Sequence, residues 1–224
     1  MTEDRRKFIR QGEEARREAL IAAALSLMAE SGPEAATVRA IADRAGVTAG
    51  LIRHYFDGKD ELMLAAYGRI MGRMTENSLA AIAHVGDGAE ARLAGFVAAS
   101  LRPPVMDPDA MGLWAGFLHL VRRDARIRAV HRATYLEYRD QLQRLIAALP
   151  RQADARQLRA DAIACNGVID GLWLEGSALP DAFDEGELVT IGLQAVGAIL
   201  GLDLAAHLPP PFTDEPAPPE TRTE

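Results

Sequence analysis

A short run of hydrogen-bond donors and small residues lies between positions 48 and 59. Thr48, Ala49 and Gly50 come first, and Arg53 and His54 follow within one helical turn. Small residues let a helix end approach a surface closely. Guanidinium, imidazole and hydroxyl groups donate hydrogen bonds to base edges and phosphate oxygens. The chemistry that these residue types favour is recognition of double-stranded DNA by a helix N-terminus in the major groove.

Further donors flank this run. Tyr55 and Lys59 follow at its rim, where a phenol and an ammonium can reach phosphates, and Thr37 stands at the start of the preceding helix. The same pattern also occurs by chance on the polar surface of an ordinary helical bundle. The candidate DNA-contacting residues are Thr37, Thr48, Ala49, Gly50, Arg53, His54, Tyr55 and Lys59.

Two short helices joined by a tight turn must position these side chains. Thr37 is a good N-cap, and Gly46 supplies the positive φ that ends the first helix. Val47 is predicted to be buried in the corner, and Thr48 to cap the second helix. This layout is a helix-turn-helix. Its apolar stripes are Val38, Ile41, Ala42 and Ala45, then Leu51, Ile52 and Phe56.

From Gly32 to Leu62 the sequence resembles the DNA-binding signature of the TetR family of one-component repressors. Two positions depart from the commonest pattern. Arg53 stands where an aromatic or small hydroxyl residue is usual, which implies a changed operator preference, and Gly58 stands where a small polar residue usually caps the next helix. The matching residues are Gly32, Thr37, Val38, Ile41, Ala42, Ala45, Gly46, Val47, Thr48, Gly50, Leu51, Ile52, Tyr55, Phe56, Lys59 and Leu62.

Composition favours an all-helical protein, because the 224 residues are rich in Ala and Leu and only 5% are aromatic. No segment approaches the roughly 18 consecutive apolar residues of a membrane span, and the charged N-terminus does not resemble a secretory signal. Cys165 has no cysteine partner in the chain, which fits a reducing cytoplasm. It could be a redox sensor, but a small buried hydrophobe is the better interpretation.

The formal net charge of -7 conceals an uneven distribution. Residues 1–56 hold nine Lys and Arg against eight Asp and Glu, hence +1, and the remaining residues account for -8. The acidic excess therefore lies away from the candidate DNA-contacting residues. We expect contact with DNA through a few placed cations rather than through a broad basic surface.

The chain divides into four predicted parts. Residues 1–12 form a basic arm that either follows phosphates or is a frayed terminus, and residues 13–62 form a three-helix DNA-binding domain whose first helix spans 13–31. Residues 63–202 form a bundle of five or six helices, entered by a long helix that runs from Lys59 to about His84. Residues 203–224 are rich in Pro and acid and form a predicted disordered tail.

Motifs of common enzymes are absent from the sequence. It contains no H-E-x-x-H, Gly-rich phosphate loop, nucleophile elbow or Cys pair. The five histidines lack the spacing of metal ligands, and His119, on an apolar helix, is better interpreted as a core or pocket residue than as a catalyst. We therefore expect no catalytic residues, no metal and no cofactor, and a helical enzyme or a structural bundle is the alternative.

The second half resembles the choline-sensing repressors of the BetI branch through Leu113 to Phe117 (LWAGF) and Val168 to Leu179 (VIDGLWLEGSAL). Glu175 departs from that branch, which usually has Arg. Aromatic faces with nearby carboxylates suit a cation, although tryptophans also simply fill cores. The candidate effector-binding residues are Trp114, Phe117, Tyr135, Tyr138, Asp170, Trp173 and Glu175.

The resemblance implies a ligand-responsive repressor. A single helix-turn-helix binds weakly, so we expect a homodimer on a near-palindromic operator. The predicted dimer surface is the last two helices, where Gly167, Gly171, Gly197 and Gly201 would let helices approach closely, unless they pack within one subunit. Since Glu175 makes the predicted pocket more negative, we expect choline, betaine aldehyde or a related amine as the effector.

Overall fold

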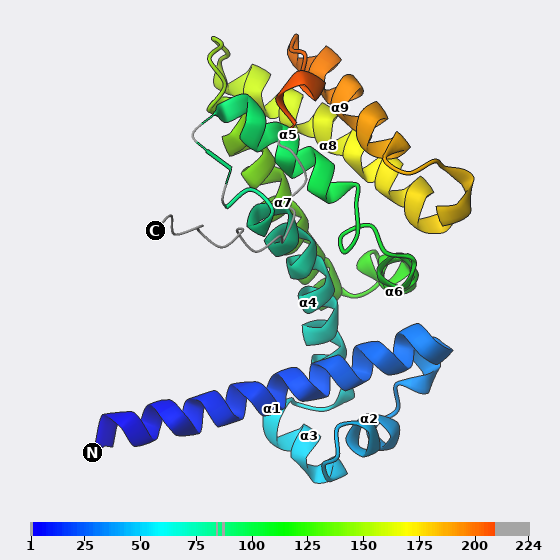
Figure 1. Ribbon diagram of the computed structural model, residues 1–224. Helices are drawn as coiled ribbons and strands as arrows, with labels where there is room; N and C mark the ends of the chain where they lie inside the picture. Colours follow the sequence, from blue (N-terminus) through cyan, green and yellow to red (C-terminus); the bar gives the residue numbers. More distant parts are fainter. Residues whose placement is uncertain (1, 84, 87, 209–224) are drawn as a thin grey trace, which may run out of the picture.

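The computed structural model describes residues 2–83, 85–86 and 88–208, and helices are the only regular secondary structure within these residues (Figure 1). The all-helical prediction is confirmed. The α-helices are α1 (Thr2–Ser31), α2 (Val38–Arg44), α3 (Ala49–Tyr55), α4 (Lys59–Ala80), α5 (Ala89–Ser100), α6 (Pro108–Val121), α7 (Ala125–Ala147), α8 (Ala155–Ala178) and α9 (Glu187–Leu200). Short 3₁₀ turns are η1 (Pro33–Ala35), η2 (Pro180–Ala182) and η3 (Ala205–His207).

The first three helices pack around the beginning of α4 and form a small unit, the predicted DNA-binding unit, at one end of the molecule (Figure 1). Its core continues along α4 as far as Met71 and includes side chains from α6 and α7. Burial of these apolar side chains fixes the position of α3 against the rest of the unit. The most deeply buried core side chains between α1 and α4 include Leu20, Ala24, Ile41, Ile52, Phe56, Leu62 and Tyr67.

The turn between α2 and α3 largely follows the prediction. Thr37 Oγ1 accepts a hydrogen bond from the Ala40 amide at 3.2 Å, and Gly46 has a φ of 66°. Two expectations were wrong in detail. Thr48 occupies the N-cap position of α3 without a side-chain capping bond, and Val47 is only half-buried. The Val47 amide donates to the Ala42 carbonyl at 2.9 Å, so backbone hydrogen bonding, rather than deep burial, closes the turn.

Helix α1 begins at Thr2, whereas the sequence predicted a helix from residue 13 preceded by a separate arm. Residues 2–11 are mostly Glu, Arg, Lys and Gln, which are strong helix formers, and one glycine at position 12 costs a helix only about 1 kcal/mol. The helix therefore continues through Gly12. It ends as predicted before Gly32, which has a φ of 82°. Contact between residues 1–12 and DNA stays a prediction.

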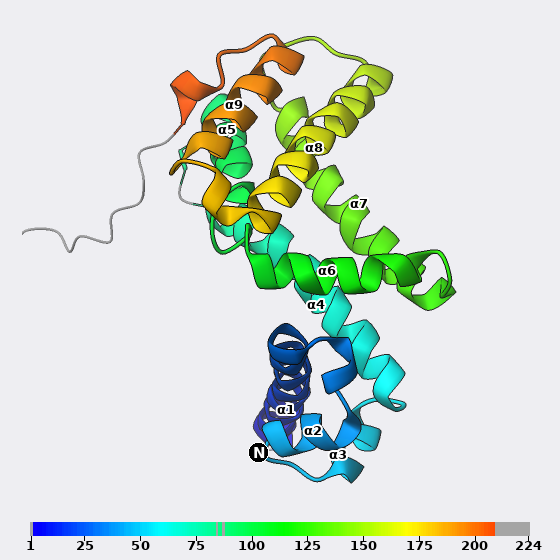
Figure 2. The same ribbon diagram turned by 90° about the vertical axis from the view of Figure 1, so that its right-hand side faces the viewer.

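Helix α4 connects the DNA-binding unit to a bundle made with α5, α7, α8 and α9 (Figure 1). It ends at Ala80, short of the predicted end near His84, which lies outside the described residues. Helix α6 lies across the junction between the unit and the bundle (Figure 2). Arg126 at the start of α7 forms an ion pair with Asp60 at the start of α4, at 3.7 Å.

The C-terminal end of the bundle departs from the sequence prediction. Leu204 is 1% exposed and belongs to the bundle core, so the chain remains packed after Asp203, where the disordered tail was expected to begin. A Cβ at Gly197 would lie 2.6 Å from the Leu202 carbonyl oxygen. Gly197 therefore allows a close approach within one subunit, which is the alternative that the sequence left open for this glycine. Residues 209–224 of the predicted tail lie outside the described residues.

Two further sequence expectations concern the lone cysteine and the absence of a membrane-spanning helix. Cys165 is fully buried in the bundle core, and burial raises the pKa of its thiol to about 12, which makes it a packing residue. Among the residues that the structure describes, no helix is long and apolar enough to span a bilayer.

Candidate DNA-reading surface and effector cavity

Helix α3 exposes the candidate DNA-contacting side chains and buries its opposite side. Ala49, Gly50, Arg53 and His54 are exposed, whereas Ile52 is fully buried in the core of the DNA-binding unit. One face of a seven-residue helix is thus anchored and the other is free. This arrangement can present a helix N-terminus and a guanidinium to the edges of bases.

The remaining candidates surround α3. Thr37 and Thr48 are exposed, and the half-buried Tyr55 ring meets the His54 ring edge to face at 4.9 Å. Lys59 is the first residue of α4 and follows Gly58, whose φ is 96°. Within the described part of the chain neither Arg53 nor Lys59 forms an ion pair, so both cations are available to an external anion.

An ion pair fixes the helix that precedes the turn. Arg44 of α2 donates two hydrogen bonds, each of 2.7 Å, to the two carboxylate oxygens of Glu30 in α1. The Arg44 guanidinium holds the pKa of the Glu30 carboxyl down at about 2. Such a two-bond pair restrains orientation as well as distance. It therefore helps to orient α2 against α1, although both side chains are partly exposed and the apolar core contributes more.

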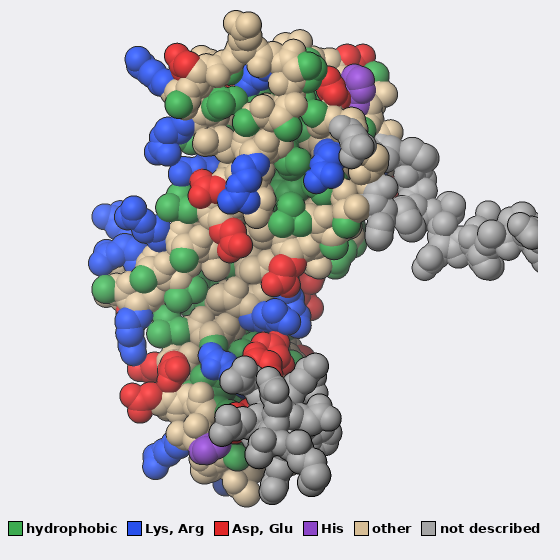
Figure 3. Space-filling view, turned by 90° about the vertical axis from the view of Figure 1, so that its left-hand side faces the viewer, with side chains coloured by type: hydrophobic (Ala, Val, Ile, Leu, Met, Phe, Trp, Pro, Cys, Tyr) green, Lys and Arg blue, Asp and Glu red, His purple; other side chains and the backbone are tan. Residues whose placement is uncertain are grey.

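The face of the molecule that Figure 3 shows carries both basic and acidic side chains. Blue and red side chains lie close together over the lower part of this face.

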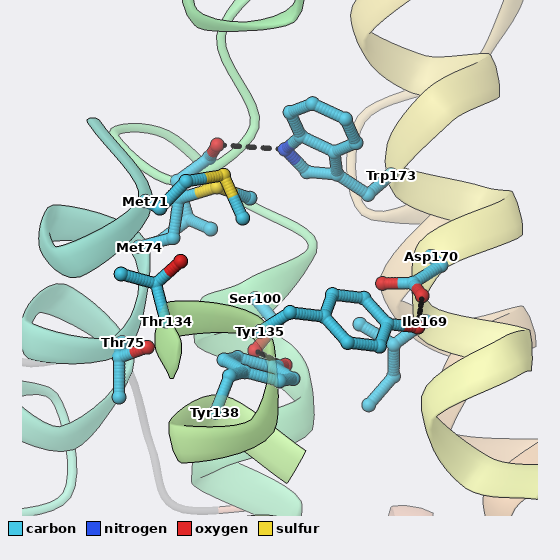
Figure 4. Close-up of a pocket in the computed structure, with 11 residues that line it drawn as sticks. Met71, Met74, Thr75, Ser100, Thr134, Tyr135, Tyr138, Ile169, Asp170 and Trp173 are labelled. Carbon is cyan, nitrogen blue, oxygen red and sulfur yellow. Dashed lines mark hydrogen bonds between the residues drawn. The ribbon is translucent and has the colours of Figure 1, made fainter. Parts of the chain in front are cut away.

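A cavity of about 40 Å³ lies in the bundle among α4, α5, α7 and α8 (Figure 4). Two methionines of α4 face the aromatic and acidic side chains of α7 and α8 across it. This volume holds a few water molecules. The cavity is lined by Met71, Met74, Thr75, Ser100, Val105, Thr134, Tyr135, Tyr138, Ile169, Asp170 and Trp173.

The carboxylate of Asp170 is the acidic group in this lining. The Tyr135 hydroxyl donates a 2.7 Å hydrogen bond to Asp170 Oδ2, and the Asn166 amide donates to the same oxygen at 2.7 Å. Burial raises the pKa of the Asp170 carboxyl, and these two hydrogen bonds oppose that shift. Within the described residues Oδ1 of Asp170 has no hydrogen bond, which leaves it available to a ligand.

Three aromatic side chains complete the cavity. The Trp173 indole N–H donates to the Val105 carbonyl at 2.8 Å, which fixes the ring plane. The Tyr138 hydroxyl is hydrogen-bonded to Ser100 Oγ at 2.7 Å, and burial raises the pKa of Tyr138, as it raises that of Tyr135 to about 12. All three rings stay neutral at physiological pH. Neutral aromatic faces beside a carboxylate form a suitable environment for a cation.

The structure brings together four of the seven predicted effector residues and places three elsewhere. Tyr135, Tyr138, Asp170 and Trp173 line the cavity. Trp114 packs edge to face on Trp173 at 5.7 Å, outside the lining, and Phe117 stacks on Tyr67 at 4.6 Å. Glu175 is exposed on α8, so the negative charge of the cavity comes from Asp170 instead.

Sequence reasoning missed the methionine, hydroxyl and amide partners of these four residues. Asn166 and Asp170 are one helical turn apart on an otherwise apolar helix face, and that spacing could have indicated a buried polar pair. Met71 and Met74 gave no such signal, because methionines on α4 are equally typical of an ordinary core.

Other predicted features fall outside this cavity. His119 is exposed, not buried, and lines an open cleft of about 460 Å³ between α6 and the DNA-binding unit. No cluster of three or more His, Cys, Asp or Glu side chains that could hold a metal ion exists among the described residues.

Comparison with known families matches both parts of the chain. Residues 20–66 match the bacterial regulatory proteins of the tetR family, and residues 89–201 match the C-terminal domain of BetI-type transcriptional repressors. The chain belongs to the TetR family. TetR family members of this type are DNA-binding transcriptional repressors and not enzymes, and the helix-turn-helix that binds DNA is the α2–α3 pair.

Two relatives that are 33% identical support this assignment. The regulator BetI 2 of Chromohalobacter salexigens is 33% identical over 178 residues, which cover 77% of this chain and 82% of that protein. The crystal structure of a transcriptional regulator from Pseudomonas aeruginosa PAO1 superposes with a TM-score of 0.74 at 33% identity, covering 87% of this chain and 94% of that one. A regulator from Saccharomonospora viridis, solved in complex with choline, has the same fold, with a TM-score of 0.63, 20% identity, and coverage of 84% and 96%.

Proposed function

We propose that a small organic cation, with choline as the leading candidate, binds in the cavity and releases this BetI-like repressor from its operator. The observation that carries the proposal is the position of Asp170 among Tyr135, Tyr138 and Trp173. A quaternary ammonium is stabilised by aromatic faces and by a carboxylate, and it cannot donate a hydrogen bond. The choline complex of the Saccharomonospora viridis regulator supports this class of ligand.

The size of the cavity has a mechanistic consequence. At about 40 Å³ it is small for a nitrogen that carries four carbon groups, so we expect binding to widen it. Met71 and Met74 are the flexible, unbranched side chains in the lining, and both belong to α4. Widening therefore displaces side chains of the helix that continues into the DNA-binding unit.

Release requires a difference in affinity between two conformations. The cation must bind more tightly to a conformation in which the cavity is wide, and DNA must bind more tightly to the other. By linkage, operator DNA then weakens cation binding by the same factor as the cation weakens DNA binding.

The repressor acts as a homodimer in this proposal. Helices α8 and α9 lie side by side (Figure 2) and expose an apolar surface formed by Ile163, Leu174, Ile191 and Ile199. Gly167 and Gly171 are exposed between Ile163 and Leu174 on α8, with space above them for a partner helix. Two copies joined here would present two α3 helices to a near-palindromic operator.

A pair of nearly isosteric ligands tests the effector class. Choline and 3,3-dimethylbutan-1-ol have similar shapes, but only choline carries a positive charge. We expect choline to raise the melting temperature and to release a duplex selected from random-sequence DNA, and the neutral alcohol to do neither. Equal effects of the two compounds, or a response to neutral or acidic compounds alone, would refute the cationic effector and leave the repressor assignment intact.

A further inference from the structure

A continuous series of ring contacts connects the DNA-binding unit to the effector cavity. Phe117 stacks on Tyr67 at 4.6 Å, and the Tyr67 hydroxyl is hydrogen-bonded to His131 Nδ1 at 2.7 Å. The His131 ring in turn stacks on the Tyr135 ring, with centroids 5.5 Å apart. Tyr135 then donates its hydroxyl to Asp170 in the cavity. The series crosses from α6 and α4 through α7 to α8.

Tyr67 is the member of this series that belongs to the DNA-binding unit. Its side chain is fully buried in the same core as Phe56 and Leu62. His131 Nδ1 is the hydrogen-bond partner of its hydroxyl among the described residues. A buried hydroxyl that loses its partner costs about 1–3 kcal/mol. Any movement of His131 away from Tyr67 therefore carries a penalty for the DNA-binding unit.

His131 contacts both neighbours in the series, Tyr67 through a hydrogen bond and Tyr135 through ring stacking. Burial lowers the pKa of its imidazole, with the charge of Asp170 opposing the shift, so the ring is neutral near pH 7. A neutral ring can accept the Tyr67 proton at Nδ1 and carry its own proton on Nε2. His131 is not among the side chains that line the cavity, and it lies on α7, away from the DNA-contacting helix α3.

We propose that His131 and Tyr67 form a relay that couples occupancy of the cavity to the DNA-binding unit. A cation that pairs with Oδ1 of Asp170 neutralises the carboxylate and weakens the hydrogen bond that Oδ2 accepts from Tyr135, and the Tyr135 ring moves as the cavity widens. His131 follows because it is stacked on that ring, and its hydrogen bond to Tyr67 on α4 is lost. The relay rests on the proposed function, since it describes how the same cavity is regulated.

The relay can be tested without any effector. Asp170→Asn removes the charge at one end, and the methyl groups of Ile41 and Ile52 report by NMR on the core of the DNA-binding unit at the other. We expect Asp170→Asn to shift these methyl resonances in the otherwise natural chain, and to shift them much less in a Tyr67→Phe background. Phenylalanine keeps the stacking on Phe117 and removes only the hydroxyl. His131→Leu removes the same hydrogen bond from the other side, and replaces Tyr67→Phe if that variant is unstable.

Tyr138→Phe is the matched control. It removes a hydroxyl on the same helix as His131, in the cavity lining but bonded to Ser100 rather than to the relay. The response to Asp170→Asn should persist in this background. Unmoved Ile41 and Ile52 methyls in the Asp170→Asn protein, or an equal response in Tyr67→Phe and Tyr138→Phe, would overturn the relay.

A second measurement separates the relay from the choice of effector. With choline as the probe, Tyr67→Phe should bind choline and selected operator DNA separately as the natural chain does. The factor by which choline weakens DNA binding should fall about fivefold, the worth of one hydrogen bond. An unchanged factor would overturn the relay. Failure of choline to bind the natural chain would overturn the choline proposal only, because the methyl experiment decides on the relay independently.

Discussion

Tyr135 and Asp170 are joined across α7 and α8 by a 2.7 Å hydrogen bond at the edge of the cavity in the bundle. The carboxylate is mostly buried, and this burial raises its pKa above the usual 3.8. The folded protein therefore places a carboxyl group where burial disfavours its charged form. An arrangement of this kind is expected where a ligand of opposite sign completes the site.

Replacing the Asp170 carboxylate with an amide should weaken effector binding and raise the stability of the folded protein. Asp170→Asn keeps the size of the side chain, removes the charge, and replaces the carboxylate with a weaker acceptor for the hydrogen bonds of Tyr135 and Asn166. We expect choline affinity to fall at least about tenfold, or about 1.4 kcal/mol, and the melting temperature without ligand to rise. Calorimetric titration and thermal unfolding measure the two effects. Choline binding at natural strength in this variant would exclude Asp170 from the site.

The pH dependence of choline binding follows from the same carboxyl. Its pKa is raised on folding, so the folded chain binds more protons than the unfolded chain between pH 3.8 and the raised value. Over that interval unfolding free energy falls as the pH rises, while the ionised form that attracts a cation accumulates. We expect choline affinity to decline on acidification through the raised pKa, at higher pH than for an ordinary Asp. Asp170→Asn should remove this dependence; a pH-independent affinity in the natural chain would contradict it.

Helix boundaries could be predicted because they depend on neighbours in the sequence. Asp107, Asp124 and Asp154 each accept a hydrogen bond from a backbone amide in the first turn of the following helix. Capping by a side chain two or three residues away requires no knowledge of the fold. The start of α1 at Thr2 was missed because a single glycine was given too much weight against a run of helix formers.

The inward face of each helix was harder to predict. Asp170 and Glu175 are five residues apart on α8, and therefore about 140° apart around the helix axis. Only one of them can face the cavity, and a sequence that contains apolar residues on several sides of α8 does not select which. The contacts of Phe117 with Tyr67 and of Trp114 with Trp173 were equally hard to predict. They depend on how α6 crosses the junction, and that crossing is set by contacts between segments that are distant in the sequence.

Arg53 is the residue in α3 that we expect to determine operator preference. It is exposed on the face opposite Ile52 and forms no ion pair within the described residues. Arg53→Ala should weaken binding to a selected operator by roughly 1–3 kcal/mol if the guanidinium contacts a guanine through two hydrogen bonds. Binding to random-sequence DNA should change much less. An unchanged footprint and affinity would exclude this role.

Lys59 should contribute in a different way. As the first residue of α4 it lies beside the DNA-reading helix rather than on it. Lys59→Ala should weaken binding to all sequences similarly and reduce the slope of log affinity against log salt concentration by about 1, as the loss of one phosphate contact does. Fluorescence anisotropy over a salt series measures this slope. Lost sequence discrimination at constant general affinity would contradict the assignment.

The exposed apolar surface of α8 and α9 should be required for the homodimer and, through it, for operator binding. Leu174 on α8 is 42% exposed, and its burial against a partner helix would contribute apolar contact. Leu174→Glu places a charge in that contact, so we expect light scattering at micromolar concentration to give the mass of one 24.2 kDa chain instead of two. Affinity for a near-palindromic operator should fall when the dimer is lost, because each half-site then binds a single chain independently.

A matched substitution on another helix controls for the added charge. Leu118 on α6 is 37% exposed, close to the exposure of Leu174, and lies outside the α8–α9 surface. Leu118→Glu should leave the dimer intact. A natural chain that is monomeric at micromolar concentration, or a Leu174→Glu protein that remains dimeric, would exclude α8 and α9 as the dimer surface. Dissociation by both substitutions would indicate a general loss of structure, which circular dichroism of the two variants measures directly.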